Sequence, residues 1–243
     1  MMQKIVLETH CGMVRDNNQD TAKAGKLSTG EIWAVVCDGM GGAAGGEIAS
    51  RIAADCFEEM IDTGYKTEFS PNSIKNFLIS AVQKANALII SEVENRPSLA
   101  GMGTTLVGAI IKDDTAYIVH VGDSRAYLLD KDVLKQITKD HSMVQVLIEQ
   151  GQLSPEEAKI HPKRNVITRV VGIDSNLQVD YDEIYFGEDQ KLLLCTDGLT
   201  NMLTDENIAR VLVSTPFFET APALVKLSNM AGGTDNVTVV VIG

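Results

Sequence analysis

The chain has 243 residues and a mass of 26.3 kDa, and 44% of its residues are apolar. This length predicts one large domain or two small ones, with enough chain to bury a core without a disulfide or a structural metal. Its 33 acidic residues outnumber the 21 basic ones, which gives a net charge of −12. The excess argues against a nucleic acid or an anionic membrane as the main partner, because both are themselves negatively charged.

The cysteines and the N-terminus give no sign of secretion or of a zinc site. No two of the four cysteines have C-x-x-C spacing, and Cys37 and Cys195 lie in or beside apolar runs that are typical of buried thiols. The first 15 residues contain no basic stretch followed by an apolar run, and no apolar run reaches the ~18 residues of a membrane span. We therefore expect a cytoplasmic protein that binds neither nucleic acid nor membrane, and we expect it to be a monomer.

The predicted elements begin with a strand at Ile32–Cys37, an apolar run rich in β-branched residues. A glycine-rich turn leads to a helix from about Gly46 to Thr63, and a second helix follows from Ser73 to about Asn95. Each helix has its apolar residues on one stripe, which predicts an antiparallel pair packed on a sheet. Short polar turns then separate three predicted strands, which indicates antiparallel hairpins. These strands are Thr104–Ile111, Thr115–Val121 and Arg125–Leu129.

The segment from Lys139 to about Gly172 has helix signals but few core-forming positions, so we interpret it as an insertion that stands off the sheet. The remaining elements return to a regular pattern. They are strands at Tyr181–Phe186 and Lys191–Thr196, helices at Asp205–Val213 and Phe217–Met230, and a final strand at Val237–Ile242. The order predicts an α+β sandwich with its helices outside the sheets.

Four aspartates stand at or beside the ends of predicted strands. Asp38 and Asp197 each follow a strand and precede a glycine, Asp123 lies in a turn between strands, and Asp235 precedes the final strand. Asp-Gly alone is typical of an ordinary turn. Four such carboxylates converging on one sheet edge would repel one another without a cation, and carboxylate oxygens are the ligands that Mg²⁺ and Mn²⁺ prefer.

Two other motifs predict different chemistry, and neither fits well. The glycines from Gly39 to Ala44 resemble a dinucleotide-binding loop, but Asp38 would stand beside the pyrophosphate and a second helix replaces the expected parallel strand. Asp140-His141-Ser142 suggests a catalytic triad, but adjacency in sequence does not give triad geometry. We interpret His141 as a polar residue of the insertion or the start of a helix.

Six motifs occur in order and at suitable spacing over residues 10–242. They are Arg15-Asp16-Asn17-Asn18-Gln19-Asp20, Asp38-Gly39-Met40-Gly41-Gly42, Gly103-Thr104-Thr105, Gly122-Asp123-Ser124-Arg125, Thr196-Asp197-Gly198-Leu199 and Gly233-Thr234-Asp235-Asn236. Together they resemble the metal-dependent protein serine/threonine phosphatases of type 2C, in their short bacterial form. The resemblance implies a four-layer α/β/β/α sandwich of two antiparallel sheets flanked by helix pairs. It also implies a single catalytic domain over residues 1–243, with a flap at about 139–172, here called the flap segment.

The resemblance assigns roles to particular residues. Asp38 would bridge two Mn²⁺ or Mg²⁺ ions, one of them completed by the Gly39 carbonyl, and Asp197 and Asp235 would hold the other ion. Asp123 matches an aspartate that supports a third ion together with Asp197. Two further residues complete the implied catalytic set with Asp38: the phosphate-gripping Arg15, whose planar fork suits two phosphate oxygens, and Asp20, which would orient water.

The implied reaction is attack on phosphorus by a hydroxide that bridges the metals, releasing phosphate from phosphoserine or phosphothreonine. The implied partners are phosphorylated proteins, namely a bacterial Ser/Thr kinase and its substrates. Larger relatives have a glutamate at the position of Gln19 and a histidine, proposed as general acid, at that of Met40. Protonation of the leaving group would then depend on water, with His161 in the flap segment as a weaker candidate.

The flap segment also carries a cationic patch, formed by Lys159, Lys163, Arg164 and Arg169. It is equally compatible with a solvated loop and with a role in steering phosphopeptides. Two other functions were weighed against the phosphatase. A catalytically silent phospho-binding module is disfavoured because all the candidate ligands are present. A phosphodiesterase or nuclease is disfavoured by the net negative charge and the absence of a basic, aromatic groove.

Overall fold

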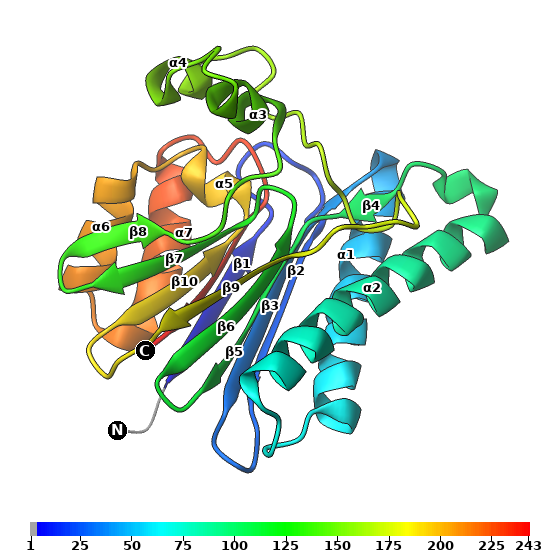
Figure 1. The fold of residues 1–243 in the computed structure, drawn as a ribbon. Helices are drawn as coiled ribbons and strands as arrows, with labels where there is room; N and C mark the ends of the chain where they lie inside the picture. Colours follow the sequence, from blue (N-terminus) through cyan, green and yellow to red (C-terminus); the bar gives the residue numbers. More distant parts are fainter. Residues whose placement is uncertain (1–3) are drawn as a thin grey trace.

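The computed structural model describes residues 4–243, apart from the side chains of residues 43 and 44. Two antiparallel sheets face each other, and helices cover both outer faces (Figure 1). The first sheet has the order β1-β11-β10-β7-β8, and the second has the order β2-β3-β5-β6-β9, with β4 paired to β3. Strand β1 pairs antiparallel with β11, so the two ends of the described chain lie in neighbouring strands.

The bounds of the strands follow the two sheets. The first sheet contains β1 (Ile5–His10), β7 (Arg125–Asp130), β8 (Val133–Gln136), β10 (Lys191–Cys195) and β11 (Val237–Ile242). The second contains β2 (Asp20–Lys26), β3 (Ile32–Met40), β4 (Gly103–Thr104), β5 (Leu106–Lys112), β6 (Thr115–Val121) and β9 (Asp180–Tyr185).

The helices divide between the two faces and the flap segment (Figure 1). On the second sheet lie α1 (Gly42–Gly64) and α2 (Pro71–Asn95). On the first sheet lie α5 (Asp197–Thr200), α6 (Asp205–Ser214) and α7 (Thr220–Met230). The flap segment contains α3 (Met143–Glu149) and α4 (Pro155–Lys159), and short 3₁₀ turns occur at η1 (Pro97–Leu99) and η2 (Phe217–Glu219).

Three apolar clusters hold the four layers together. One lies between the first helix pair and the second sheet, one between the two sheets, and one between the first sheet and α5–α7. Strand β3 shows why an unbroken apolar run was needed: Trp33 and Val35 face the helices, whereas Ala34 and Val36 face the other sheet. Side chains alternate along a strand, so a strand in the middle of four layers must be apolar on both faces. The predicted α/β/β/α layering is confirmed.

One predicted connection was wrong. The short turn after β6 led us to expect a hairpin with β7, but β6 pairs with β5 and β9 while β7 pairs with β8 and β10. The chain passes from one sheet to the other at residues 122–124. A three-residue link therefore joins the two sheets, and the hairpin rule failed because a short turn can also lead into the facing sheet.

Strands β1, β2 and β8 were not predicted, one strand is longer than expected, and one predicted helix is divided. Strands β1, β2 and β8 are only partly buried, so they lack the apolar runs that identify inner strands. Strand β3 continues past Cys37 to Met40, because Asp38 pairs with Asp20 and the next two residues pair with β4. The predicted helix Phe217–Met230 is divided into η2 and α7.

The flap segment rises from one end of the sandwich, with α3 and α4 standing clear of the sheets (Figure 1). Helix α3 begins directly after Ser142, whose hydroxyl caps it by accepting from the Gln145 N–H. Within residues 4–243 no cysteine forms a disulfide, and Cys37 and Cys195 are buried as predicted. None of the described helices is both long and apolar enough to cross a membrane.

Candidate metal centre

The candidate aspartates gather at the end of the sandwich that lies under the flap segment. Figure 1 shows the end of β3, the β6–β7 turn, α5 and the loop before β11 meeting there. These segments come from both sheets and from widely separated parts of the chain. The burial and mutual electrostatic influence of their carboxylates, given below, show that the structure brings them together.

Asp38 is fixed by its own backbone near the end of β3. Its N–H donates to Thr105 Oγ1 at 2.9 Å, and its carbonyl accepts from the Thr105 N–H and from Thr104 Oγ1, both at 2.9 Å. Burial raises the pKa of its carboxyl group well above the usual range, and the charges of Asp20 and Asp197 add to the effect. The β2–β3 register places Asp20 directly opposite, and like charges at opposite positions destabilise a sheet.

The glycine after Asp38 is required by close packing. A Cβ atom on Gly39 would lie 2.1 Å from the Gly46 carbonyl oxygen, so the N-terminal part of α1 can approach the end of β3 only with glycine there. The neighbouring Gln19 donates from Nε2 to the Gly42 carbonyl at 3.0 Å, which ties its side chain to the start of the same helix.

Asp20 is 7% exposed and is held by two threonine hydroxyls, from Thr238 in β11 and from Thr196, the residue that follows β10. Its Oδ2 accepts from Thr196 Oγ1 at 2.9 Å and from Thr238 Oγ1 at 2.7 Å. Its Oδ1 is buried and has no hydrogen-bond partner in the described part of the chain. Burial raises its pKa to about 7, and the charges of Asp197 and Asp235 contribute.

Asp197 is the first residue of α5, where a carboxylate is favoured by the helix dipole. Asn201, one turn later, donates to its Oδ2 at 2.9 Å. Burial raises the pKa of Asp197, and the charge of Asp235 is the next cause. Gly198 lies under the loop before β11, because a Cβ atom there would come within 1.8 Å of the Asn236 carbonyl oxygen.

Asp235 and Arg15 form an exposed ion pair, with Arg15 Nη2 2.9 Å from Asp235 Oδ2. The loop that carries Arg15 is held by Asn236. This side chain accepts from the Gln19 N–H at 2.8 Å and donates to the carbonyls of Cys11 and Asn17 at 2.9 and 2.8 Å. The loop of residues 11–19 is thereby placed beside the aspartates.

Asp123 lies in the turn that crosses from β6 to β7, and it is 7% exposed. Its Oδ1 is a second buried carboxylate oxygen without a partner among residues 4–243. Burial raises its pKa to about 8, and the charges of Asp197 and Asp140 add to this. The shared influence of Asp197 places Asp123 in the same electrostatic cluster.

The donor set fits hard divalent cations. It consists of carboxylate oxygens, two of them buried without partners, and burial together with mutual repulsion raises the pKa of most of these groups. A cation in the cluster would offset that repulsion, and oxygen-only sites suit Mg²⁺ or Mn²⁺. The members of this cluster are Asp20, Asp38, Asp123, Asp197 and Asp235.

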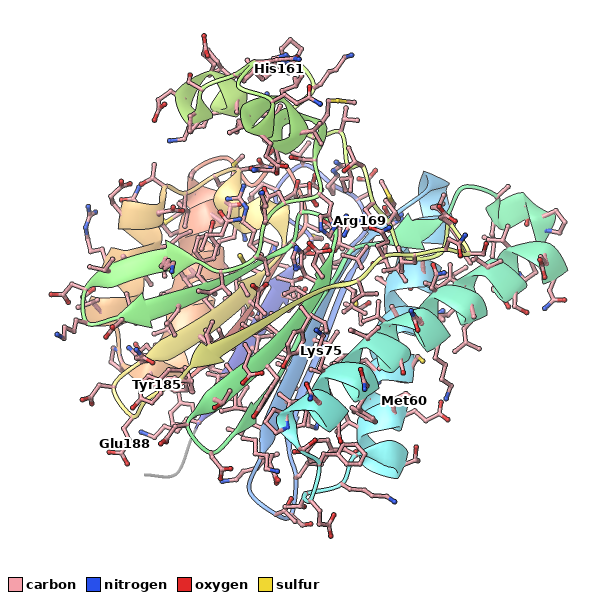
Figure 2. All side chains as sticks on the ribbon, viewed as in Figure 1. Met60, Lys75, His161, Arg169, Tyr185 and Glu188 are labelled. Atoms are coloured by element: carbon pink, nitrogen blue, oxygen red, sulfur yellow. The ribbon has the colours of Figure 1, made fainter. Side chains whose placement is uncertain are left out.

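The cationic residues of the flap segment separate into two groups. Arg169 lies at the base of the segment and pairs with Asp180, whereas Lys163 and Arg164 are exposed on the outer part. Figure 2 shows His161 at the far side of the segment, with Arg169 nearer the sheets. The structure therefore does not bring His161 to the aspartates.

Reasoning from the residues missed the supports around the centre. The hydroxyls of Thr196 and Thr238 hold Asp20, and Asn236 holds the Arg15 loop, but these contacts join residues far apart in sequence. The only signal was that each supporting residue lies within one or two positions of a candidate aspartate or in a strand beside one.

The fold and this cluster define a metal-dependent phosphatase, and comparison with known proteins agrees. The family model described as Protein phosphatase 2C matches residues 10–230. Over 239 residues the chain is 35% identical to the serine/threonine phosphatase stp of Listeria innocua, covering 96% of this chain and 93% of that protein. The chain belongs to the protein phosphatase 2C family.

Solved structures give the same result. The serine/threonine phosphatase Stp1 from Staphylococcus aureus superposes with a TM-score of 0.93 at 33% identity, covering 100% of this chain and 95% of that one. The catalytic domain of the serine threonine protein phosphatase PstP, solved in complex with two manganese ions, has a TM-score of 0.84 at 32% identity. It covers 99% of this chain and 97% of its own.

Proposed function

We propose that this protein hydrolyses phosphoserine and phosphothreonine in proteins, using two or three divalent cations held by the aspartate cluster. The observation that carries the proposal is the convergence of five aspartates with Arg15 at one end of the sandwich. The family to which the chain belongs and the serine/threonine phosphatases that resemble it support the substrate class. We further propose that these phosphoproteins are products of a Ser/Thr kinase.

The proposed ligand roles follow the resemblance, and the clustering of the aspartates supports them. Asp38 and the Gly39 carbonyl would hold one Mn²⁺ or Mg²⁺ ion, and Asp38 with Asp197 and Asp235 a second. Asp123, together with Asp197, would hold a third. When bound, the ions lower the pKa of a water molecule, so that hydroxide is available to attack phosphorus, and offset charge on the phosphoryl oxygens.

The protein's own side chains bind the phosphate and handle the proton. Arg15 is half exposed on a loop pinned by Asn236, so its planar guanidinium can donate to two phosphate oxygens at once. Asp20 Oδ1 is a free acceptor inside the site and can orient an attacking water by accepting a hydrogen bond from it. Met40 cannot donate a proton, so water in the site would protonate the leaving serine or threonine oxygen.

The test compares substrates of different classes. We expect Mn²⁺-dependent phosphate release from a phosphothreonine peptide, loss of release in EDTA, and little hydrolysis of a phosphodiester. A phosphodiester hydrolysed faster than the phosphopeptide would contradict the proposed substrate class. Release that continues in EDTA would contradict the role of the aspartate cluster.

A further inference from the structure

The two ends of the flap segment meet the Asp123 turn at one buried residue, His141. It is 7% exposed. Its backbone N–H donates to the Gly122 carbonyl at 2.9 Å, and its Nδ1 accepts from the Gly122 N–H at 3.1 Å. Both backbone polar groups of Gly122, the residue before Asp123, are therefore bonded to His141.

The same residue contacts the returning end of the flap segment. Its carbonyl accepts from the Thr168 N–H at 2.8 Å, and its Nε2 lies 3.2 Å from Asp180 Oδ2. The Gly122 N–H can only donate, so Nδ1 accepts and the ring proton lies on Nε2, facing Asp180. Arg169 Nη1, which also lies beside Nε2, then donates to Asp180 Oδ1 and not to the ring. Burial, with the charges of His120 and Arg169, lowers the pKa of His141 to about 4, which keeps the ring neutral.

The next question is whether this cluster is itself a metal site. His120, His141 and Asp180 each offer a ligand atom within 4.8 Å of the others. However, Arg169 Nη1 already lies 3.0 Å from His141 Nε2 and bonds to Asp180. A metal on Nε2 would require a proton on Nδ1, which faces the Gly122 N–H donor. The hydrogen bonds therefore indicate a structural link between the turn and the flap segment.

His120 strengthens that link. Its ring stacks on the ring of His141, with centroids 4.6 Å apart, and its Nε2 donates to the Lys139 carbonyl at 2.8 Å. Asp140, which lies between Lys139 and His141 in the sequence, accepts from Arg125 Nη2 at 2.6 Å. Arg125 directly follows the Asp123 turn. Three consecutive residues at the start of the flap segment, Lys139 to His141, are thus bonded to β6, to the first residue of β7 and to the turn between these strands.

We infer that His141 is a positioning residue that couples the flap segment to Asp123, by bonding to both the N–H and the carbonyl of Gly122. The inference rests on the proposed function, because it takes Asp123 as a cation ligand. Asp123 Oδ1 has no hydrogen-bond partner in the described chain, so the backbone of the turn determines where that oxygen points. Gly122 has a φ of +104°, and a Cβ there would lie 2.6 Å from Thr105 Cγ2, so the turn requires glycine at this position. The two hydrogen bonds to His141 then hold the backbone of this glycine in place.

Two substitutions test the contacts of the two ring nitrogens of His141 separately. His141→Asn can place its amide oxygen near the position of Nδ1 and so keep the acceptor for the Gly122 N–H. His141→Gln can reach toward Asp180 but leaves the Gly122 N–H without its acceptor. Glu149→Gln is the matched control, because it breaks an exposed ion pair of the flap segment, with Lys139 at 2.9 Å, and leaves His141 unchanged.

The first readout is Mn²⁺ binding to the metal-free protein, measured by calorimetric titration, with Asp123→Ala marking the site concerned. We expect His141→Gln to weaken that site by about tenfold or more, as changes to residues behind a metal ligand commonly do. His141→Asn and Glu149→Gln should bind within about twofold of the wild type. The thermal stability of each variant is measured in parallel.

The second readout needs no variant: amide hydrogen exchange in the metal-free wild type should show the Gly122 amide to be strongly protected. An unprotected Gly122 amide, unchanged Mn²⁺ binding in His141→Gln, or equal losses in the Asn and Gln variants would each overturn the inference. Failure of the wild type to bind Mn²⁺ would instead overturn the proposed function, so the two failures are distinguishable.

Discussion

Asp20→Asn should make the metal-free protein more stable while weakening its metal binding. In the structure Oδ2 of Asp20 accepts from two threonine hydroxyls, whereas Oδ1 has no partner in the part of the chain described. An asparagine can keep its carbonyl oxygen at the Oδ2 position, so the substitution removes charge and retains both bonds.

The size of the effect follows from the pKa of Asp20, which rises from 3.8 to about 7 on folding. At about 1.4 kcal/mol per pH unit this corresponds to about 4 kcal/mol. An acid with a raised pKa binds its proton more tightly in the native state, so the free energy of unfolding falls as the pH rises from about 4 to about 7. The full destabilisation by the ionised Asp20 carboxylate is present above pH 7, and at pH 5 only about 1.5 kcal/mol of it remains.

The assay is urea unfolding in EDTA at pH 8 and pH 5, with Asp132→Asn as a control that removes one exposed negative charge. We expect Asp20→Asn to be more stable than the wild type by up to about 4 kcal/mol at pH 8, and by clearly less at pH 5. Added Mn²⁺ should stabilise the wild type more than the variant. An Asp20→Asn protein that is no more stable than the wild type at pH 8 would refute the reasoning.

Three further predictions concern the supports of the site and the flap segment. Asn236→Ala removes three hydrogen bonds to the loop at 11–19, so it should lower the free energy of unfolding in urea by about 2–4 kcal/mol and raise KM for a phosphopeptide. An unchanged KM would argue against the loop's role in binding phosphate. Gly198→Ala would bring a Cβ within 1.8 Å of a carbonyl oxygen, so it should lower the free energy of unfolding by about 1–3 kcal/mol or more, and wild-type stability would show that the loop before β11 can move away. Arg164→Ala should reduce activity on phosphoproteins more than on a small aryl phosphate, and equal loss on both would contradict a steering role for the cationic patch.

The inner strands and long helices could be predicted because burial leaves a simple pattern. Strand β6 and strand β11 have the predicted bounds, and both are almost entirely buried. Strand β2 reads Asp-Thr-Ala-Lys-Ala-Gly-Lys at a sheet edge and carries no such pattern. The β6–β7 turn was misread because the turn length is the same whether the next strand joins the same sheet or the facing one.

The site was predictable in part. Four aspartates could be selected from the residues alone, because each stands at or beside a strand end, whereas Asp20 was selected only by resemblance. Its importance depends on Thr238, 218 residues away, and no local pattern reports such a contact. His141 was interpreted as a polar residue at a helix start; α3 does begin beside it, but the bonds of its ring to Gly122 depend on the fold.

The most direct test of the central claim is the rate of phosphate release from a phosphothreonine peptide as Mn²⁺ is added to the metal-free protein. The account predicts no release without the ion, saturable activation by Mn²⁺, and loss of activity in Asp197→Ala, with the peptide still bound. Binding of the peptide by the wild type without release at any Mn²⁺ concentration would contradict it and identify a phospho-binding module on the same fold.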